Sequence, residues 1–143
     1  MSFTTYSNFT HAAEFFLGVD NFLTNVNKAS ELYWAHMGFT HSKPPQYKVE
    51  SEGKRFAKIS VYQERKGIVA VERVYVFIDL NNGNIHKPQS YKAAETTGKT
   101  KGIRGNIFDP NVLDCVTLYG TVYLTERGSF DTIANELSLA PTV

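Results

Sequence analysis

Four histidines are the residues of this sequence with the clearest capacity to bind a metal ion. A structural or catalytic zinc site needs His, Cys or carboxylate ligands at short, regular spacing. His36 and His41 are five residues apart across a predicted helix end, with no Cys or carboxylate at ligand spacing, and neither His11 nor His86 completes such a set. We therefore predict surface or core-edge histidines, no metal site and no cofactor.

A glycine-lysine-threonine triplet, residues 98–100, resembles the end of a phosphate-binding P-loop. A P-loop also requires a glycine five residues before its final glycine and a helix directly after the motif. Ala93 stands at the position of the leading glycine, and no helical pattern follows. The sequence thus argues against nucleotide hydrolysis but leaves a flexible cationic loop.

A hydrolytic triad of Ser90, His86 and Asp79 has the right residue types but lacks the nucleophile-elbow motif. The single cysteine, Cys115, lies in an apolar strand-like pattern, so we expect it to pack as a small hydrophobic residue. One cysteine cannot form an internal disulfide, which is compatible with a reducing compartment. We predict no catalytic residues and no enzymatic activity.

The segment from 86 to 105 concentrates basic side chains that only Glu95 opposes. Lysine and arginine can neutralise the phosphates of a nucleic acid, and an aromatic ring among them can stack on a base. We therefore predict that this loop binds nucleic acid or another anion through Lys87, Tyr91, Lys92, Lys99, Lys101 and Arg104.

The net charge of +1 conceals an uneven distribution along the chain. Residues 41–104 carry thirteen Lys and Arg against six Asp and Glu, which gives +7, whereas residues 1–40 carry −2 and residues 105–143 carry −4. Such asymmetry favours a basic face for anionic partners. The alternative is that the acidic ends fold back over the basic middle and neutralise it.

Aromatic residues lie on or beside the strands that neighbour this loop, namely Tyr47, Phe56, Tyr62, Tyr75 and Phe77. A sheet face that carries aromatic rings beside basic loops is a common way to bind single strands. Tyr75 and Phe77 could equally be buried under the N-terminal helices, and the sequence does not decide between these alternatives.

The first 40 residues show helical spacing of apolar side chains, and Thr10 could cap the first helix. A break near residues 18–21 would separate it from a second helix that begins at Asn27 and has an apolar stripe ending at His36 and Met37. Gly38 stands where a left-handed C-terminal cap belongs.

Strand patterns follow the prolines of residues 44–45. Residues 56–63 alternate partly and residues 69–80 alternate strongly, with Val74, Val76 and Ile78 on one face and Tyr75 and Phe77 on the other. Asn81 to Asn84 predict a hairpin turn, and a strand from Ile85 that Pro88 interrupts is expected at a sheet edge or in a short arm. Residues 112–125 fit one bulged strand or two short ones, and residues 131–137 fit a short helix.

Helices that precede strands favour an α+β fold with N-terminal helices packed on an antiparallel sheet of four or five strands. At 143 residues we expect one domain. Its helical part is residues 1–40, its sheet residues 41–127 with the basic loop 86–105, and its C-terminal tail residues 128–143. No apolar stretch approaches the roughly 20 residues of a membrane span, and the first thirty residues lack a signal-peptide pattern.

A series of short motifs runs through residues 77–93 and continues in residues 104–109. In order, they are Phe-Ile-Asp, Gly-Asn-Ile, Lys-Pro, Ser-Tyr-Lys-Ala and Arg-Gly-Asn-Ile-Phe-Asp. The pattern resembles small uncharacterised proteins of bacteriophages and other DNA viruses, over about residues 54–109. It departs from them at Gln89, Tyr91 and Ala94 and in a longer Gly/Thr/Lys insert. The resemblance implies a viral origin and a shared local architecture, with no activity or catalytic residue to transfer.

Three functions fit these observations. The first is a non-catalytic viral protein that binds nucleic acid through its basic hairpin loop. The second is a structural or decoration protein of a virion, which could form homo-oligomers through its opposed charge blocks. The third is an inhibitor of a host protein. Each would act in the host cytoplasm or in the virion, with a nucleic acid or another viral or host protein as partner and no membrane.

Overall fold

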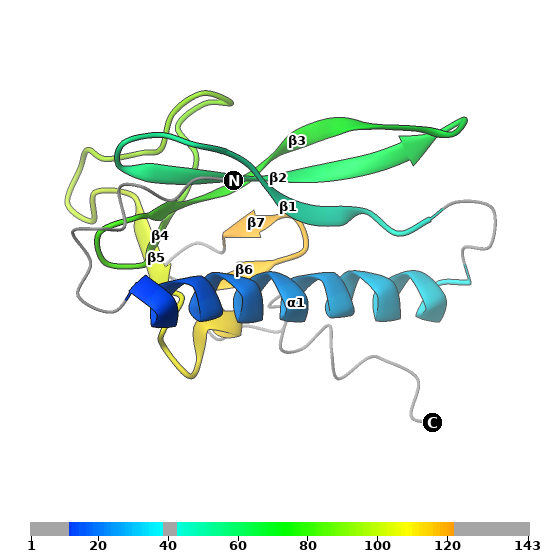
Figure 1. Cartoon of the computed structure of the whole chain (residues 1–143), viewed down its shortest axis with the longest axis horizontal. Coiled ribbons are helices and arrows are strands. Elements are labelled where there is room, and N and C mark those ends of the chain that lie inside the picture. The colour runs from blue at the N-terminus through cyan, green and yellow to red at the C-terminus, as the bar shows by residue number, and fades with distance from the viewer. Residues whose placement is uncertain (1–11, 39–42, 122–143) are drawn as a thin grey trace.

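The computed structural model describes residues 12–38 and 43–121. One helix, α1 (Ala12–His36), precedes five strands that form one antiparallel sheet, so the predicted α+β class is confirmed. The strands are β1 (Gln46–Glu52), β2 (Phe56–Arg65), β3 (Ile68–Asp79), β4 (Asn84–His86) and β5 (Ile103–Asn106). Figure 1 shows α1 lying along one face of this sheet.

Helix α1 is continuous, so the predicted break near residues 18–21 is wrong. Its buried stripe runs straight through that region: Phe15, Val19, Phe22, Val26 and Ala29. These side chains recur at three- and four-residue intervals, so helical packing on the sheet outweighs the low helix propensity of Gly18. The stripe does not extend to His36 and Met37, which are exposed.

The end of α1 matches the prediction from sequence. Met37 N donates to Tyr33 O, Gly38 N donates to Ala35 O, and Gly38 adopts a φ of 74°. A left-handed glycine after the last helical residue is the usual C-terminal cap. The predicted cap at Thr10 lies outside the described residues.

The five strands are ordered β1-β2-β3-β4-β5, so each pairs with its neighbour in the chain. The two strands expected at residues 56–63 and 69–80 are β2 and β3. The strand that begins before Ile85 is short, but it lies between β3 and β5, so the expected edge position is wrong. Pro88 is accommodated because it follows β4 and pairs with Ala94 in an isolated bridge outside the ladder.

The alternation predicted for β3 fails at Tyr75. Ile59 pairs with Val76 while Ser60 pairs with Val74, which makes Tyr75 an extra residue in β3. A bulge of this kind redirects the side chains on either side of it. Tyr75 therefore joins Val76 and Ile78 in the core instead of facing the opposite side.

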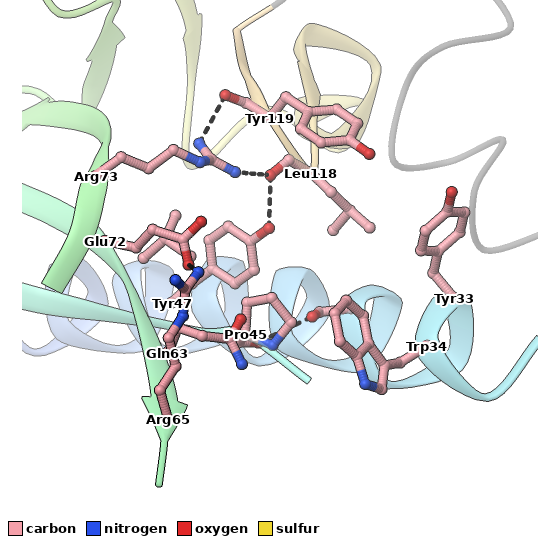
Figure 2. A pocket seen from close by; sticks show the side chains of 12 residues that line it. Tyr33, Trp34, Pro45, Tyr47, Gln63, Arg65, Glu72, Arg73, Leu118 and Tyr119 are labelled. Atoms are coloured by element: carbon pink, nitrogen blue, oxygen red, sulfur yellow. Dashed lines mark hydrogen bonds and ion pairs between the residues drawn. The ribbon is translucent and has the colours of Figure 1, made fainter. Parts of the chain in front are cut away.

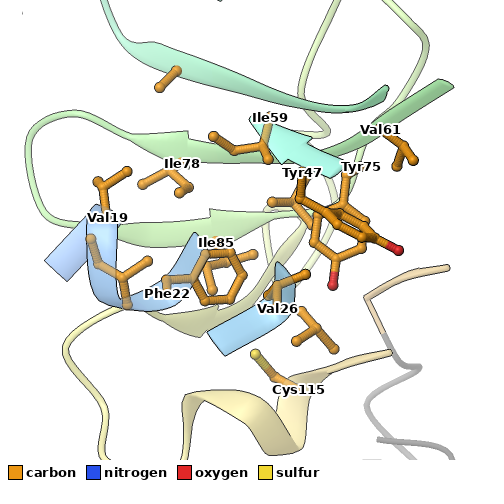
Figure 3. Packing of buried hydrophobic residues seen from close by; sticks show 14 of the residues in the cluster. Val19, Phe22, Val26, Tyr47, Ile59, Val61, Tyr75, Ile78, Ile85 and Cys115 are labelled. Carbon is orange, nitrogen blue, oxygen red and sulfur yellow. The ribbon is translucent and has the colours of Figure 1, made fainter. Parts of the chain in front are cut away.

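The hydrophobic core lies between α1 and the facing side of the sheet (Figure 3). Helical Phe22 and Val26 pack with Ile59, Ile78 and Ile85 of the strands, all of them at most 1% exposed. Cys115 is also fully buried in this core, as expected for a small hydrophobic residue.

A short segment after the sheet closes one side of the core. It consists of the 3₁₀ helix η2 (Val112–Cys115), β6 (Val116–Thr117) and β7 (Gly120–Thr121), so of the two patterns expected here, two short strands form. Tyr47 donates its hydroxyl proton to Leu118 O at 2.5 Å (Figure 2), and Tyr75 donates to Thr117 O. Residues 122–125 and the helix expected at 131–137 lie outside the described residues.

Candidate functional site

The side of the sheet turned away from α1, which we call the outer face, carries charged and aromatic side chains. In β2 the core residues Ala57, Ile59 and Val61 alternate with Phe56, Lys58, Ser60 and Tyr62. Because successive side chains of a strand point to opposite sides, the second set lies on the outer face.

Three cations lie over aromatic rings on this face. The Nζ of Lys48 is 5.3 Å from the Tyr62 ring centre, the Nζ of Lys58 is 4.0 Å from that of Tyr91, and the Cζ of Arg55 is 4.8 Å from that of Phe56. Side chains two residues apart on a strand are separated by about 6.6 Å. The three pairs therefore form a row along β2, which we call the cation–aromatic strip: Lys48, Arg55, Phe56, Lys58, Tyr62 and Tyr91.

Tyr91 reaches the strip from the basic loop. Residues 87–95 form a small hairpin in which Glu95 N donates to Lys87 O and Gln89 N donates to Ala93 O. From its tip the Tyr91 hydroxyl donates to Glu50 Oε2 at 2.7 Å, a contact that spans 41 residues of sequence. This hydrogen bond and the cation–π contact with Lys58 fasten the loop to β1 and β2.

Glu50 is the electrostatic centre of that attachment. Partial burial by itself would raise the pKa of Glu50, but hydrogen bonds from Ser60 and Tyr91 and the charge of Lys58 outweigh it and lower the pKa. Ser60 Oγ donates to Glu50 Oε1 at 2.5 Å, and Lys58 Nζ is 3.8 Å from Glu50 Oε2. The same hydrogen bond to Glu50 raises the pKa of the Tyr91 hydroxyl, because it stabilises the protonated form.

We expect the stability that ionised Glu50 provides to disappear in acid. Because folding lowers the pKa of Glu50, its contribution is present above the carboxyl's ordinary pKa and is lost as the pH falls through the lowered one. Thermal unfolding should show wild type more stable than Glu50→Gln at about pH 7 and indistinguishable from it at about pH 2.5. An equal gap between the two proteins at both pH values would contradict this role.

A groove of ≈ 450 Å³ opens on the outer face beside Phe56, between the β1–β2 turn and the loop. Its apolar side chains are Phe56, Phe77, Ala93 and Ala94, and four cations line it as well: Lys54, Arg55, Lys58 and Lys92. Arg55 Nε is 3.2 Å from Asp79 Oδ2 and Lys58 is paired with Glu50. Lys54 and Lys92 have no ion pair with any described carboxylate, so their charges are available to a ligand.

The six residues predicted from sequence do not gather in one place. Tyr91 belongs to the strip and Lys92 to the groove, while Lys87 and Arg104 line a second cavity of ≈ 300 Å³ beside Tyr119. Lys99 and Lys101 are exposed in the turn that precedes β5. A role for Lys87, Lys99, Lys101 and Arg104 in binding stays a prediction.

The aromatic residues exposed on the outer face are not all those that the sequence indicated. Tyr75 and Phe77 are 1% and 4% exposed and cannot stack on a ligand, whereas Tyr91 is 46% exposed and Phe56 and Tyr62 are half-buried. Sequence reasoning did not include Lys48, Lys54, Arg55 or Lys58 in the site. The available signal was the alternation of residues 56–63, which puts Lys58 on the same face as Phe56 and Tyr62.

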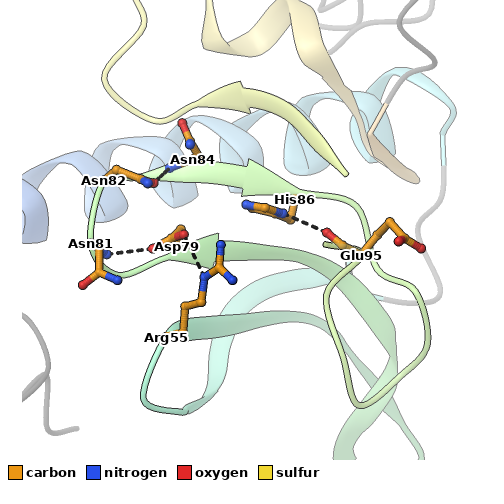
Figure 4. A network of polar contacts seen from close by, with 7 residues as sticks. All are labelled: Arg55, Asp79, Asn81, Asn82, Asn84, His86 and Glu95. Carbon is orange, nitrogen blue, oxygen red and sulfur yellow. Dashed lines mark hydrogen bonds and ion pairs between the residues drawn. The ribbon is translucent and has the colours of Figure 1, made fainter. Parts of the chain in front are cut away.

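Figure 4 shows the polar contacts of two residues of the rejected triad, Asp79 and His86. His86 is 1% exposed, and its Nδ1 lies 2.9 Å from Glu95 O. Asp79 accepts from Arg55 and from Asn81 N, and Ser90 Oγ accepts from Lys92 N.

Within residues 12–38 and 43–121, no cluster of three His, Cys, Asp or Glu residues could hold a metal ion. Among the described residues, no helix is long and apolar enough to cross a membrane.

A family model matches residues 14–117 of this chain, a span that includes β1 to β5, the strip and the groove. The chain belongs to DUF7717, a family of unknown function. No curated protein and no solved structure matches it significantly. For this DUF7717 protein, the resemblance to small viral proteins stays a prediction.

Proposed function

We propose that this DUF7717 protein is a non-catalytic viral protein that binds nucleic acid with the outer face of its sheet. The observation that carries the proposal is the cation–aromatic strip, in which three cation–ring pairs follow one another along β2. A protein of this kind would act in the host cytoplasm or in the virion.

The chemistry of the strip suits an extended, single-stranded ligand. Every base has a π-face that can stack on an aromatic ring, and each stacked base contributes about 1–3 kcal/mol. Phe56, Tyr62 and Tyr91 supply the rings, and the cation over each ring would contact a neighbouring phosphate of a bound strand. Because Phe56 and Tyr62 are only half-exposed, Tyr91 is the ring best placed to stack on a base.

The groove supplies the phosphate contacts. Glu50 partly neutralises Lys58 and Asp79 partly neutralises Arg55, which leaves Lys54 and Lys92 as the lysines without a described counter-ion in the groove. Each neutralised phosphate releases counter-ions, so the affinity for a single strand should fall with salt at a slope of about −0.7 per contact.

The test compares two double variants that remove the same charge from different places. We expect Lys54→Ala/Lys92→Ala to weaken binding of a labelled single-stranded DNA about tenfold and to reduce the salt slope by about 1.4. Lys99→Ala/Lys101→Ala, which removes two exposed charges outside the groove, should weaken it less than about threefold. Fluorescence anisotropy between about 25 and 200 mM salt measures both quantities.

Any of three results would refute the proposal. The first is no binding at micromolar protein, and the second is a wild-type affinity that does not change with salt. The third is an equal loss in the two double variants, which would mean that overall charge, and not the outer face, determines binding. Duplex DNA of the same sequence, and RNA, serve as competitors that identify the preferred form.

A further inference from the structure

The hairpin of β2 and β3 extends beyond both of its neighbours in the sheet. β1 pairs with β2 only as far as Tyr62, and β4 pairs with β3 only at Phe77 and Ile78. The remaining ribbon, residues 63–72, projects from the sheet, as Figure 1 shows. We call it the arm.

The arm is exposed and largely apolar at its end. Lys66 and Gly67, both with positive φ, form its two-residue turn, and the chain continues as Ile-Val-Ala-Val over residues 68–71. Ile68 is 69% exposed and Val69 is 54% exposed. Long, apolar, exposed edges of this kind favour pairing with another strand, and many proteins blunt them with charges or proline.

The β3 edge of the arm has backbone groups available for such pairing. Arg65 and Ile68 are the pair that closes the turn. In an antiparallel ladder, alternate residues direct their N–H and C=O away from the partner strand, and counting from Ile68 these are Val69 and Val71. Among the described residues, no strand pairs with this edge.

We infer that a second copy of this chain pairs with the arm, with the two β3 edges antiparallel and Val69 opposite Val69 of the other copy. Such a contact is isologous and closes with two-fold symmetry. It places Ile68 opposite Ala70 and brings the exposed apolar side chains of both arms together. This association does not depend on nucleic-acid binding.

The charges and the neighbouring segment favour this register. In this register Gly67 of each turn falls opposite Val71 of the other arm, so the turn residue Lys66 lies beside Glu72 of that arm. Glu72 is 3.4 Å from Arg65 of its own chain, so each end of the contact places a carboxylate between two cations. Arg65 lies on β2 and does not face the second copy. The Arg73 guanidinium turns to Leu118 O and Tyr119 O, at 2.9 Å each. A register shifted toward Arg73 and Val74 would collide with that segment, so the free edge ends at Glu72.

Cysteine cross-linking tests the pairing in the full-length protein. Cys115 is fully buried, so a cysteine introduced on the arm is the accessible thiol within the described residues. Opposed residues have Cα atoms about 5.5 Å apart, within the range of a disulfide. We expect Val69→Cys to form disulfide-linked dimers under mild oxidation. The dimer yield from Val71→Cys, or from Thr24→Cys on α1, should be at least tenfold lower. Efficient dimers from Val71→Cys, or equal yields at all three sites, would overturn the proposal.

A second variant removes the association without a new cross-link. Val69→Lys puts a charge on the edge, and within its own chain the lysine would face Glu64, so the monomer should keep its thermal stability. Light scattering at about 100 μM protein should show a larger mean mass for wild type than for Val69→Lys. A wild type that is monomeric at this concentration would overturn the inference.

Discussion

Replacement of Gly102 with alanine should lower the free energy of unfolding by about 3 kcal/mol, because two costs add there. Gly102 has a φ of 76°, a conformation that disfavours side chains. A Cβ at this position would also collide with the backbone carbonyl and the Cβ of Glu95. The carbonyl of Gly102 accepts from Lys87 N at 2.9 Å, so the collision would push the basic loop away from the start of β5.

Gly98 provides the matched control. It has nearly the same φ, 83°, but an added Cβ would meet nothing within 4 Å. Gly98→Ala should therefore cost about 1 kcal/mol, the conformational part alone. Urea unfolding of both variants measures the difference, and equal losses would show that the contact with Glu95 can relax.

Replacement of Tyr75 with alanine should lower the free energy of unfolding by about 4 kcal/mol, the cost of removing a large buried side chain. Tyr75 is 1% exposed, its ring centre is 4.7 Å from that of Tyr47, and its hydroxyl donates to Thr117 O. Tyr75→Phe should cost about 1 kcal/mol, since it removes the hydroxyl and keeps the ring. Urea unfolding at neutral pH measures both.

Tyr91 should show the opposite profile, although sequence reasoning considered both tyrosines as binding residues. It is 46% exposed on the outer face, so Tyr91→Ala should change the stability by less than about 1 kcal/mol. It should weaken the binding of single strands by at least about 1 kcal/mol through the lost stacking surface. If Tyr91→Ala unfolds the protein as readily as Tyr75→Ala, the distinction between core and contact surface is wrong.

The fold was predictable where the pattern was strong and local. Strong alternation in residues 69–80 and the asparagine-glycine turn identified β3 and the hairpin to β4, because both depend on residues close in sequence. The break in α1 was predicted from the low propensity of Gly18, which packing of the apolar stripe overrides. No local signal marks the bulge at Tyr75, since it depends on the register with β2.

The candidate site was less predictable because it joins distant segments. The basic loop was visible in the sequence, but its attachment depends on Tyr91 meeting Glu50, 41 residues earlier in the chain. The groove likewise combines Lys54 of the β1–β2 turn with Lys92 of the loop. Side chains that meet in this way follow from the three-dimensional path of the backbone, which residue spacing does not specify.

The hydrogen bond from Tyr47 to Leu118 has a consequence for the order in which the protein folds. The sheet pairs only sequential neighbours, so hairpins can assemble it one strand at a time. Tyr47 and Leu118 are 71 residues apart, and Tyr75 and Thr117 are 42 apart. Closing such long loops is entropically costly until the intervening strands are in place. We therefore expect residues 116–121 to dock late in folding, after the sheet has formed. The hydrogen bonds from Tyr47 and Tyr75 to this segment would then form at the end of folding and not in its nucleus.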